Sequence, residues 1–294
     1  MSVAASAPAS RRPRDRRWRG PLLLLAPTIL VMTYAFAAPL ITFFEYSFYR
    51  FRRGRLEQVF TLDTYSRFLF DSYYHVVIYD TLRMATIVTL LSLAIGYPLA
   101  YALYRINRPA IQRWLALLIF SPILVSVVVR SYGWIVLLSD QGPVNWLLLR
   151  FGVLAEPATL VFNLFGVVIS LTHVFLPFVV FPIFSSLTRL DPALKEAAED
   201  LGANWWTTFR RVTFPLSLPG VVAGAQIAFT LALGAFVTPA MLGGGRVLVL
   251  PLQVYNATTD INWPVAAVGG MALLVISMVA VAAFNRLLKY SEAR

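Results

Sequence analysis

Six long stretches of the chain consist almost entirely of apolar residues, and shorter polar segments separate them. A helix needs about 20 consecutive apolar residues to cross the hydrocarbon core of a bilayer, and the six stretches reach that length. The pattern therefore predicts an all-α integral membrane protein with six transmembrane helices in a domain over residues 20–290. The predicted spans cover residues 21–45, 82–104, 114–138, 159–187, 216–242 and 264–286.

The longest informative polar segment, residues 191–215, lies between the fourth and fifth apolar stretches. Asp191 is placed to cap a helix, and Pro192 occupies the first helical position, where a missing N–H costs nothing. Apolar and charged residues then alternate at helical spacing, which predicts a short amphipathic helix. Its apolar face has small residues that permit close approach by another protein. That face comprises Ala193, Leu194, Ala197, Ala198 and Leu201.

A second short helix is predicted directly after the first. Gly202 can adopt the left-handed conformation that ends a helix, and Asn204 can cap the next one, through Arg211. We expect Pro215 and Pro219 to end this second helix and begin the fifth span. The segment is thus a helix-turn-helix elbow at the membrane surface. Two roles are open for its aromatic residues, packing beneath the helical bundle or anchoring in lipid headgroups. These residues are Trp205, Trp206 and Phe209.

Composition excludes several classes of protein. With 59% hydrophobic and 13% charged residues and a mean hydropathy of +0.70, the chain is too apolar for a soluble domain of 294 residues. It has no cysteine, which excludes a disulfide framework and a thiolate metal site. The net charge of +11 is spread over short loops, so it indicates membrane orientation rather than nucleic-acid binding.

The distribution of positive charge predicts the topology. Most of the 25 Lys and Arg residues fall in an N-terminal tail over residues 1–19, in loop 105–113, in the elbow and at the C-terminal end. The tail is rich in Ala, Ser, Pro and Arg, which predicts disorder. Because cytoplasmic loops carry an excess of Lys and Arg, both termini and the elbow are expected in the cytoplasm. Four arginines within residues 50–55 count against this assignment.

The sequence contains no phosphate-binding loop for a nucleotide. A phosphate-binding loop needs GxxxxGK followed by Ser or Thr, whereas the chain's two lysines, Lys195 and Lys289, do not follow glycine. If the function needs an energy source, that energy would have to come from a partner or an ion gradient. We interpret His75 as a surface residue and His173 as a hydrogen-bonded helix-packing residue, with a relay or substrate contact as the alternative for His173. No metal site or catalytic cluster is indicated.

The elbow resembles the coupling loop of binding-protein-dependent ABC importer permeases. The resemblance is carried by Glu196-Ala197-Ala198, three residues, Gly202, nine residues, and Val212-Thr213-Phe214-Pro215, where Val212 and Phe214 stand for the usual Ile and Leu. In that family the loop docks in a cleft of a separate ATPase subunit. The resemblance implies an ATPase-docking surface formed by six residues of the elbow. They are Glu196, Ala197, Ala198, Asp200, Leu201 and Gly202.

Further stretches resemble the spermidine/putrescine branch of these permeases, although permeases for phosphonates, iron and other small solutes share parts of the pattern. They are Gly96-Tyr97-Pro98-Leu99-Ala100-Tyr101, Arg130-Ser131-Tyr132-Gly133-Trp134, Gly142-Pro143-Val144-Asn145 and Leu218-Pro219-Gly220. The resemblance implies a type I importer fold in a bacterial inner membrane. It also implies several partners: ATP-binding subunits carrying ATP and Mg²⁺, a second permease subunit that is a paralogue or a second copy of this chain, and an extracytoplasmic solute-binding protein. The permease itself would be non-catalytic and hold no cofactor.

Candidate residues for a substrate path are few. The predicted spans contain no carboxylate apart from Glu45 at the outer end of the first, so Asp80, expected at the outer mouth of the second span, is the best contact for an incoming cation. A capping or solvated role for Asp80 is the alternative. Arg130 is expected to snorkel to the outer surface, and Tyr132 lies two positions later. An ion-coupled secondary transporter stays a second candidate, but it would need more ionisable groups within the spans.

Overall fold

The computed structural model describes residues 19–52 and 54–292, so the basic tail expected over residues 1–19 lies outside the described residues apart from Arg19. The chain divides into two units, Met1–Tyr46 and Ser47–Arg294. The described part of the first unit is helix α1 (Arg19–Tyr46), which has Pro27 and Pro39 in its interior and includes an apolar span over Leu24–Tyr46.

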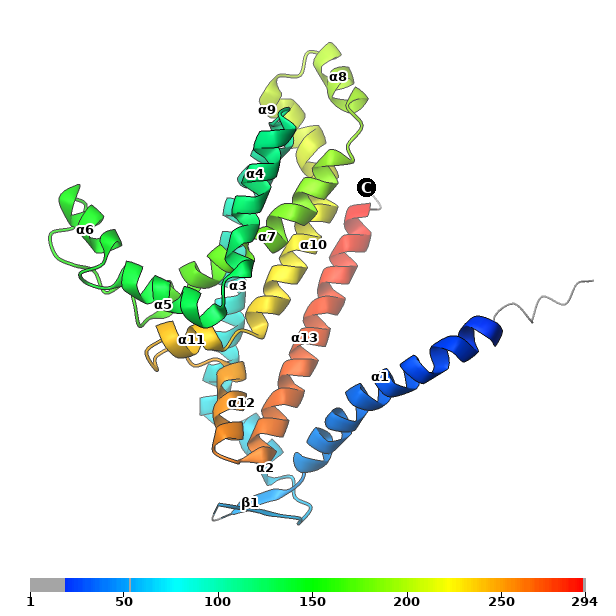
Figure 1. The fold of residues 1–294 in the computed structure, drawn as a ribbon, viewed down its shortest axis with the longest axis vertical. Helices are drawn as coiled ribbons and strands as arrows, with labels where there is room; N and C mark the ends of the chain where they lie inside the picture. Colours follow the sequence, from blue (N-terminus) through cyan, green and yellow to red (C-terminus); the bar gives the residue numbers. More distant parts are fainter. Residues whose placement is uncertain (1–18, 53, 293–294) are drawn as a thin grey trace, which may run out of the picture. The chain divides into compact units, whose positions relative to one another are not determined.

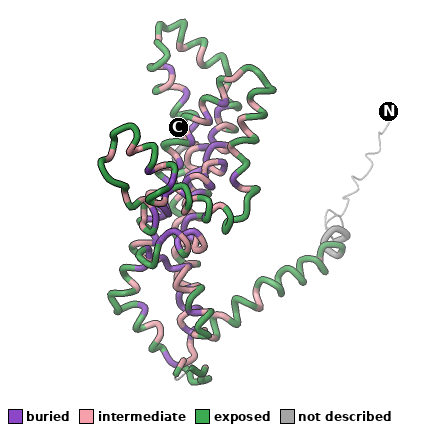
Figure 2. The backbone as a smooth tube through the Cα atoms, turned by 60° about the vertical axis from the view of Figure 1, so that its left-hand side comes forward, coloured by how far each residue is buried: buried purple, intermediate pink, exposed green. Residues whose placement is uncertain are grey.

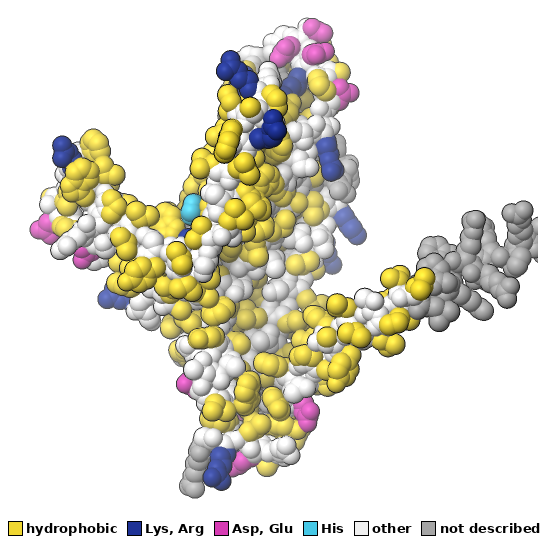
Figure 3. All heavy atoms as spheres, viewed as in Figure 1, with side chains coloured by type: hydrophobic (Ala, Val, Ile, Leu, Met, Phe, Trp, Pro, Cys, Tyr) yellow, Lys and Arg dark blue, Asp and Glu magenta, His cyan; other side chains and the backbone are white. Residues whose placement is uncertain are grey.

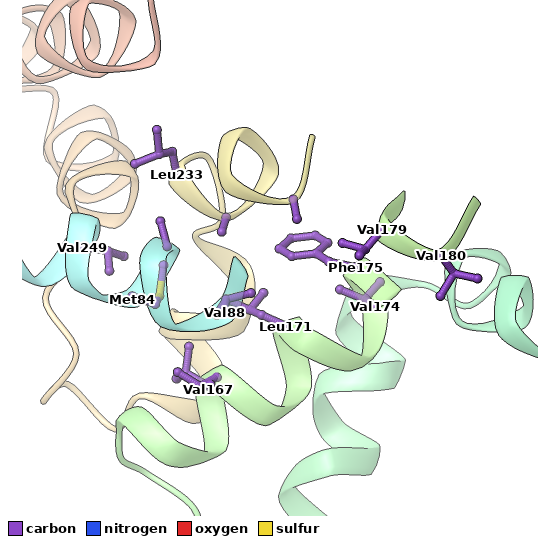
Figure 4. Close-up of a cluster of buried hydrophobic side chains, with 14 of the residues drawn as sticks. Met84, Val88, Val167, Leu171, Val174, Phe175, Val179, Val180, Leu233 and Val249 are labelled. Carbon is purple, nitrogen blue, oxygen red and sulfur yellow. The ribbon is translucent and has the colours of Figure 1, made fainter. Parts of the chain in front are cut away.

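The second unit is a helical bundle built around three long helices. These are α3 (Ser72–Arg105), α7 (Leu164–Thr188) and α10 (Phe214–Leu233), with α13 (Trp263–Glu292) beside α10. Figure 1 shows their near-parallel course, and Figure 2 shows that buried backbone concentrates inside this bundle. Figure 4 shows Met84 and Val88 of α3 against Val167 and Leu171 of α7. The core is therefore aliphatic and formed mainly by three helices.

A close approach of two helices depends on Gly220 in α10. A Cβ atom added there would lie 2.6 Å from the carbonyl oxygen of Pro182 in α7 and 2.6 Å from the Cβ of Ser186. Helices in membranes pack through such small residues because lipid supplies little hydrophobic driving force for their association. Gly220 thus sets the spacing between α7 and α10.

The third predicted span is broken. It consists of α4 (Pro109–Phe120), a 3₁₀ turn (Ser121–Leu124) and α5 (Val127–Leu138), followed by α6 (Pro143–Arg150). The helical segments before and after residues 125–126 are inclined at 101°. The prediction of one continuous helix over 114–138 is therefore wrong. Pro122 has no N–H to continue the ladder, and Val125 and Ser126 adopt extended backbone.

The fifth span also differs from its prediction at both ends. Helical backbone runs without interruption over Trp205–Leu233, through α9 (Trp205–Thr208), a π turn (Phe209–Thr213) and α10. Pro215 and Pro219 therefore do not separate the second elbow helix from the span. The Phe214 N–H bonds to Phe209 O, and this wider turn accommodates Pro215, which has no N–H to donate. The span ends at Leu233, and α11 (Val237–Leu242) is a separate helix.

Additional elements lie at the bundle end opposite the elbow. An antiparallel hairpin pairs β1 (Arg50–Arg52) with β2 (Arg55–Glu57), Arg50 opposite Glu57, and α2 (Asp63–Phe70) follows. The Tyr73 N–H donates to Asp71 Oδ1 at 2.9 Å, so α3 begins at Ser72 rather than at residue 82. The apolar pattern did not indicate this hairpin.

Two loops differ from the apolar pattern. The loop before α7 ends later than predicted, and the loop before α13 contains a helix. Helix α7 begins at Leu164 rather than at residue 159, because Asn163 caps it through a 3.0 Å bond from the Gly166 N–H. The loop before α13 contains α12 (Leu250–Thr259), which is tied to α3 by a 2.9 Å bond from the Leu250 N–H to Thr81 Oγ1.

Within the described residues, five helices are long and apolar enough to cross a membrane, and the bent pair raises the number to six if it counts as one span. Hydrophobic side chains cover the middle of the bundle, and charged ones gather toward its ends (Figure 3). The prediction of an all-α membrane protein is confirmed, with one short hairpin added.

Candidate functional site

The elbow connects α7 to α10 at one end of the bundle (Figure 1). Its first helix, α8 (Ala193–Asp200), begins where Asp191 Oδ1 accepts a hydrogen bond from the Ala193 N–H at 3.0 Å. A carboxylate at this position satisfies a free N–H group and interacts favourably with the helix dipole. The expected cap at Asp191 is present in the structure.

The turn between the two elbow helices is fixed by backbone geometry. Gly202 has φ +79°, its N–H donates to Glu199 O at 2.8 Å, and the Ala203 N–H donates to Ala198 O at 3.0 Å. This pair of bonds satisfies the last carbonyls of α8. Asn204 Oδ1 then accepts from the Thr207 N–H at 2.9 Å and caps α9. The C-terminal end of α8 and the N-terminal end of α9 are thus closed by local hydrogen bonds.

One face of α8 is open to a partner. Of the six residues predicted to dock an ATPase, five are exposed and Ala198 is half-buried. Leu201 is 89% exposed, and Glu196, Glu199 and Asp200, which precede it within five residues, are exposed as well. Acidic side chains gather at this end of the bundle (Figure 3). The structure brings these six residues together on one short helix and its C-terminal turn. A large exposed leucine among carboxylates is suited to a partner with an apolar cleft and a basic rim.

The opposite side of the elbow contacts the end of α3. Lys195 Nζ donates to Tyr104 Oη at 2.8 Å and lies 4.3 Å from the centre of its ring. Trp205 Nε1 donates to Tyr101 Oη at 3.1 Å, and the Phe209 ring lies 5.4 Å from that of Tyr101. Trp205 and Phe209 therefore pack beneath the bundle, which was one of the two roles expected.

Sequence reasoning assigned no role to the tyrosines of α3 or to Lys195. Tyr97, Tyr101 and Tyr104 follow one another at intervals of four and three residues, which places them on one helix face. That spacing was a readable signal for an aromatic face at the end of the second span. Lys195 gave no signal, because a lysine on the polar face of an amphipathic helix normally points to water.

Arg130 differs from its prediction. Its Nη1 donates to Pro122 O at 2.7 Å and to Val125 O at 3.3 Å, so the side chain turns back over the break in the third span rather than snorkelling to the surface. It lines a cavity of about 210 Å³ between α5, α7 and the break after α10. The guanidinium thus supplies donors to carbonyl groups that the helix break leaves without partners.

The other proposed path residues do not gather around Arg130. Asp80 lies half-buried inside α3 rather than at its mouth, because the helix begins at Ser72. Tyr132 is 64% exposed, and neither residue lines the cavity beside Arg130. The structure therefore does not bring the three together.

The two histidines have different surroundings. His75 is exposed, as expected, and its Nε2 lies 2.7 Å from Leu69 O. His173 packs edge-on against Trp134 with ring centres 5.6 Å apart, which agrees with a helix-packing role. Its Nδ1 is buried and has no hydrogen-bond partner in the described part of the chain, so the expected hydrogen bond at that atom is missing.

A cavity of about 530 Å³ lies at the hairpin end of the bundle. Its lining includes Arg50, Arg52, Arg67 and Asp63, and Arg50 Nη2 lies 2.8 Å from Asp63 Oδ2. Hydrogen bonding to Thr61, and then the Arg50 guanidinium, lower the pKa of Asp63 below its ordinary value of 3.8. Positive charge exceeds negative charge in this lining, which makes the cavity suitable for anionic groups.

Comparison with known proteins identifies a family and similar sequences. Residues 21–294 match the family model described as binding-protein-dependent transport system inner membrane component. The spermidine/putrescine transport system permease protein PotB of Salmonella typhimurium (strain SL1344) is 37% identical over 225 residues, covering 75% of this chain and 77% of that protein. PotB of Haemophilus influenzae is 32% identical over 264 residues, covering 90% of this chain and 88% of that protein.

A similar solved structure is a chain of a bacterial ABC transporter that imports the acidic polysaccharide alginate. It superposes with a TM-score of 0.76 at 18% identity, covering 94% of this chain and 96% of that chain. At this identity the likeness concerns the fold. The fold is that of an importer permease. In this chain, the fold includes the bent third span and the elbow.

Proposed function

Because the chain belongs to the family of inner membrane components of binding-protein-dependent transport systems, we propose that it is the permease through which an ATP-driven importer moves a polyamine. The chain is a multi-pass membrane subunit of an ABC importer and is not an enzyme. The finer assignment concerns its partners, its orientation and its solute.

One observation carries the assignment of partners. Helix α8 is capped at both ends, exposes Leu201 and Glu196, and is joined by short connections to two core helices, α7 and α10. A stiff element with an open face can receive force from a moving partner. We assign that partner as an ATP-binding subunit, which holds ATP and Mg²⁺. A second permease subunit, a paralogue of this chain, would complete the path.

Charge supports an orientation with the elbow in the cytoplasm. Arg105, Arg108 and Arg113 lie near the elbow end of α3 and α4, and Arg210 and Arg211 lie within the elbow. Basic residues accumulate on the cytoplasmic side of membrane helices. Both termini then lie in the cytoplasm, and the hairpin end faces the outer side, where a solute-binding protein would dock. The membrane is the inner membrane of a bacterium.

The solute assignment rests on the PotB relatives and on the chemistry of cations. A polyamine needs carboxylate or aromatic partners when it leaves water. Helix α3 carries the half-buried Asp80, and Tyr132 and Tyr255 offer exposed rings on α5 and α12. These groups are sparse and separated, so most of the selectivity would belong to the binding protein.

Uptake into proteoliposomes tests the assignment. The complete transporter, with ATP on the elbow side and binding protein outside, is expected to accumulate labelled spermidine, and unlabelled putrescine should compete. Accumulation of a different solute only, such as a phosphonate, would overturn the polyamine assignment. Uptake that follows an ion gradient and ignores ATP would overturn the ATP-driven assignment in favour of a secondary transporter.

A further inference from the structure

We propose that Tyr97, Tyr101 and Tyr104 form a latch that makes α3 follow the elbow when a partner moves it. The proposal rests on the proposed function, because it concerns how force reaches the third core helix. The three tyrosines lie on α3 and are not part of the docking surface. The proposal assigns them a positioning role in transport.

The three tyrosines contact three successive segments of the chain, two in the elbow and one at the start of α10. Tyr104 accepts a hydrogen bond from Lys195 of α8, and Tyr101 accepts one from Trp205 of α9. Tyr97 Oη lies 3.0 Å from Ser217 Oγ at the start of α10. The contacts therefore run in order along the chain from α8 to the start of α10, and each uses a tyrosine hydroxyl.

Aromatic packing fills the space between these polar contacts. The Phe209 ring lies 5.9 Å from that of Tyr97 and 5.4 Å from that of Tyr101, edge-on in both cases. Phe209 also stacks on Trp205, with ring centres 5.8 Å apart. Edge-to-face and offset contacts at such distances are favourable and directional. The elbow and the end of α3 thus form one aromatic cluster.

The covalent connections explain why such a latch would matter. The chain enters the elbow from α7 and leaves it into α10, whereas α3 is joined to the elbow only through side chains. Helices α3, α7 and α10 share one core. Motion of the elbow is passed directly to α7 and α10, and the tyrosine contacts pass it to α3 as well. All three helices can then move as one body.

Lys195 is informative because it directly precedes the docking residues in the sequence, yet its side chain contacts the end of α3. It adjoins Glu196 on α8, but its ammonium group lies against the Tyr104 ring and hydroxyl. Helix α8 therefore has a docking face and an anchoring contact. If Lys195 pointed to water instead, this contact between α8 and α3 would be lost.

Variants of the latch separate coupling from folding. Tyr104→Leu removes both the ring and the hydroxyl, and Tyr104→Phe keeps the ring beneath the ammonium group. Trp205→Phe removes the donor to Tyr101. Trp206→Phe is the matched control, because Trp206 is 57% exposed and stacks on Phe209 at 5.7 Å, on the elbow itself. Lys195→Met tests the same contact as Tyr104→Leu from a surface position, where loss of folding is not expected.

The measurement is the amount of solute transported per ATP hydrolysed by the complete reconstituted transporter. We expect Tyr104→Leu, Lys195→Met and Trp205→Phe to lower this ratio by about fivefold or more, the lower end of typical coupling between sites, with ATPase binding unchanged. Tyr104→Phe should recover part of the ratio. Lys195→Met combined with Tyr104→Leu should be no worse than either alone, because both remove one contact.

Two results would overturn the latch alone. One is an unchanged ratio in both Lys195→Met and Trp205→Phe, and the other is an equal fall in Trp206→Phe. Absence of ATP-dependent transport by the unchanged chain would instead overturn the proposed function, and the latch with it. The two failures are therefore distinguishable.

Discussion

At the scale of single residues, Gly202 decides the direction in which the elbow turns. Its φ of +79° lies in the left-handed region, and a Cβ atom added there would meet no heavy atom within 4 Å. Space is therefore available for a side chain, and the constraint is conformational. The left-handed conformation costs a non-glycine residue roughly 1–2 kcal/mol, and a β-branched residue is disfavoured most strongly.

Replacing Gly202 with Val is expected to reorient the end of α8 and reduce transport while the chain stays in the membrane. Gly202→Asn is the control, because asparagine tolerates the left-handed conformation and should retain most transport. Solute uptake normalised to the amount of chain in the membrane measures the effect. Equal uptake by the valine variant and the unchanged chain would show that the turn does not need this conformation.

The lowered pKa of Asp63 predicts that the local stability of the hairpin end depends on pH. The folded chain lowers the pKa of this carboxyl below 3.8, through Thr61 and then Arg50. The carboxylate therefore stabilises this region above the unfolded pKa, and the contribution is lost as pH falls through the lower folded pKa. Hydrogen exchange in the hairpin of Asp63→Asn should exceed that of the unchanged chain by a constant factor at neutral pH. The difference should disappear in acid, and a difference that persists unchanged there would contradict this account.

At the scale of elements, local signals predicted the elbow well and the broken span poorly. Asp191, Gly202 and Asn204 act on backbone groups two or three residues away, so sequence alone reveals their roles. The break in the third span lies within an uninterrupted apolar stretch, so hydropathy alone could not reveal it. Ser121-Pro122 was the one local hint of a break. It did not suffice to predict one, because a proline also occurs inside the unbroken helices α3 and α10.

Arg130 is expected to stabilise the bend between α4 and α5. Replacing it with Met removes the donors to Pro122 O and Val125 O, and hydrogen bonds that involve a charged group contribute about 1.5–3 kcal/mol. We expect a clearly lower unfolding temperature for Arg130→Met in detergent. Arg113→Met is the matched control, since Arg113 is exposed on α4. An equal and small effect of both substitutions would show that the bend does not depend on Arg130.

At the scale of the whole molecule, the contacts that join the elbow to the bundle lay beyond sequence reasoning. Lys195 and Tyr104 are 91 residues apart, and Trp205 and Tyr101 are 104 apart. No local pattern shows which tyrosine contacts which elbow residue. The packing of α3 against α7 and α10 determines these pairs. The two ends of the bundle also differ in chemistry. Acidic docking residues lie on α8 at one end, and arginines surround a cavity at the other.

The central claim is that the exposed face of α8 docks a separate ATPase. Purification from native membranes in mild detergent, with identification of the associated chains and an assay of ATP hydrolysis, tests it most directly. The unchanged chain should retain an ATP-hydrolysing subunit and a second permease. Glu196→Arg should lower retention of the ATPase by about tenfold, equivalent to about 1.4 kcal/mol of binding free energy. Glu57→Arg, an exposed charge reversal on the hairpin, should not. Recovery of the chain alone, with uptake driven by an ion gradient, would contradict the claim.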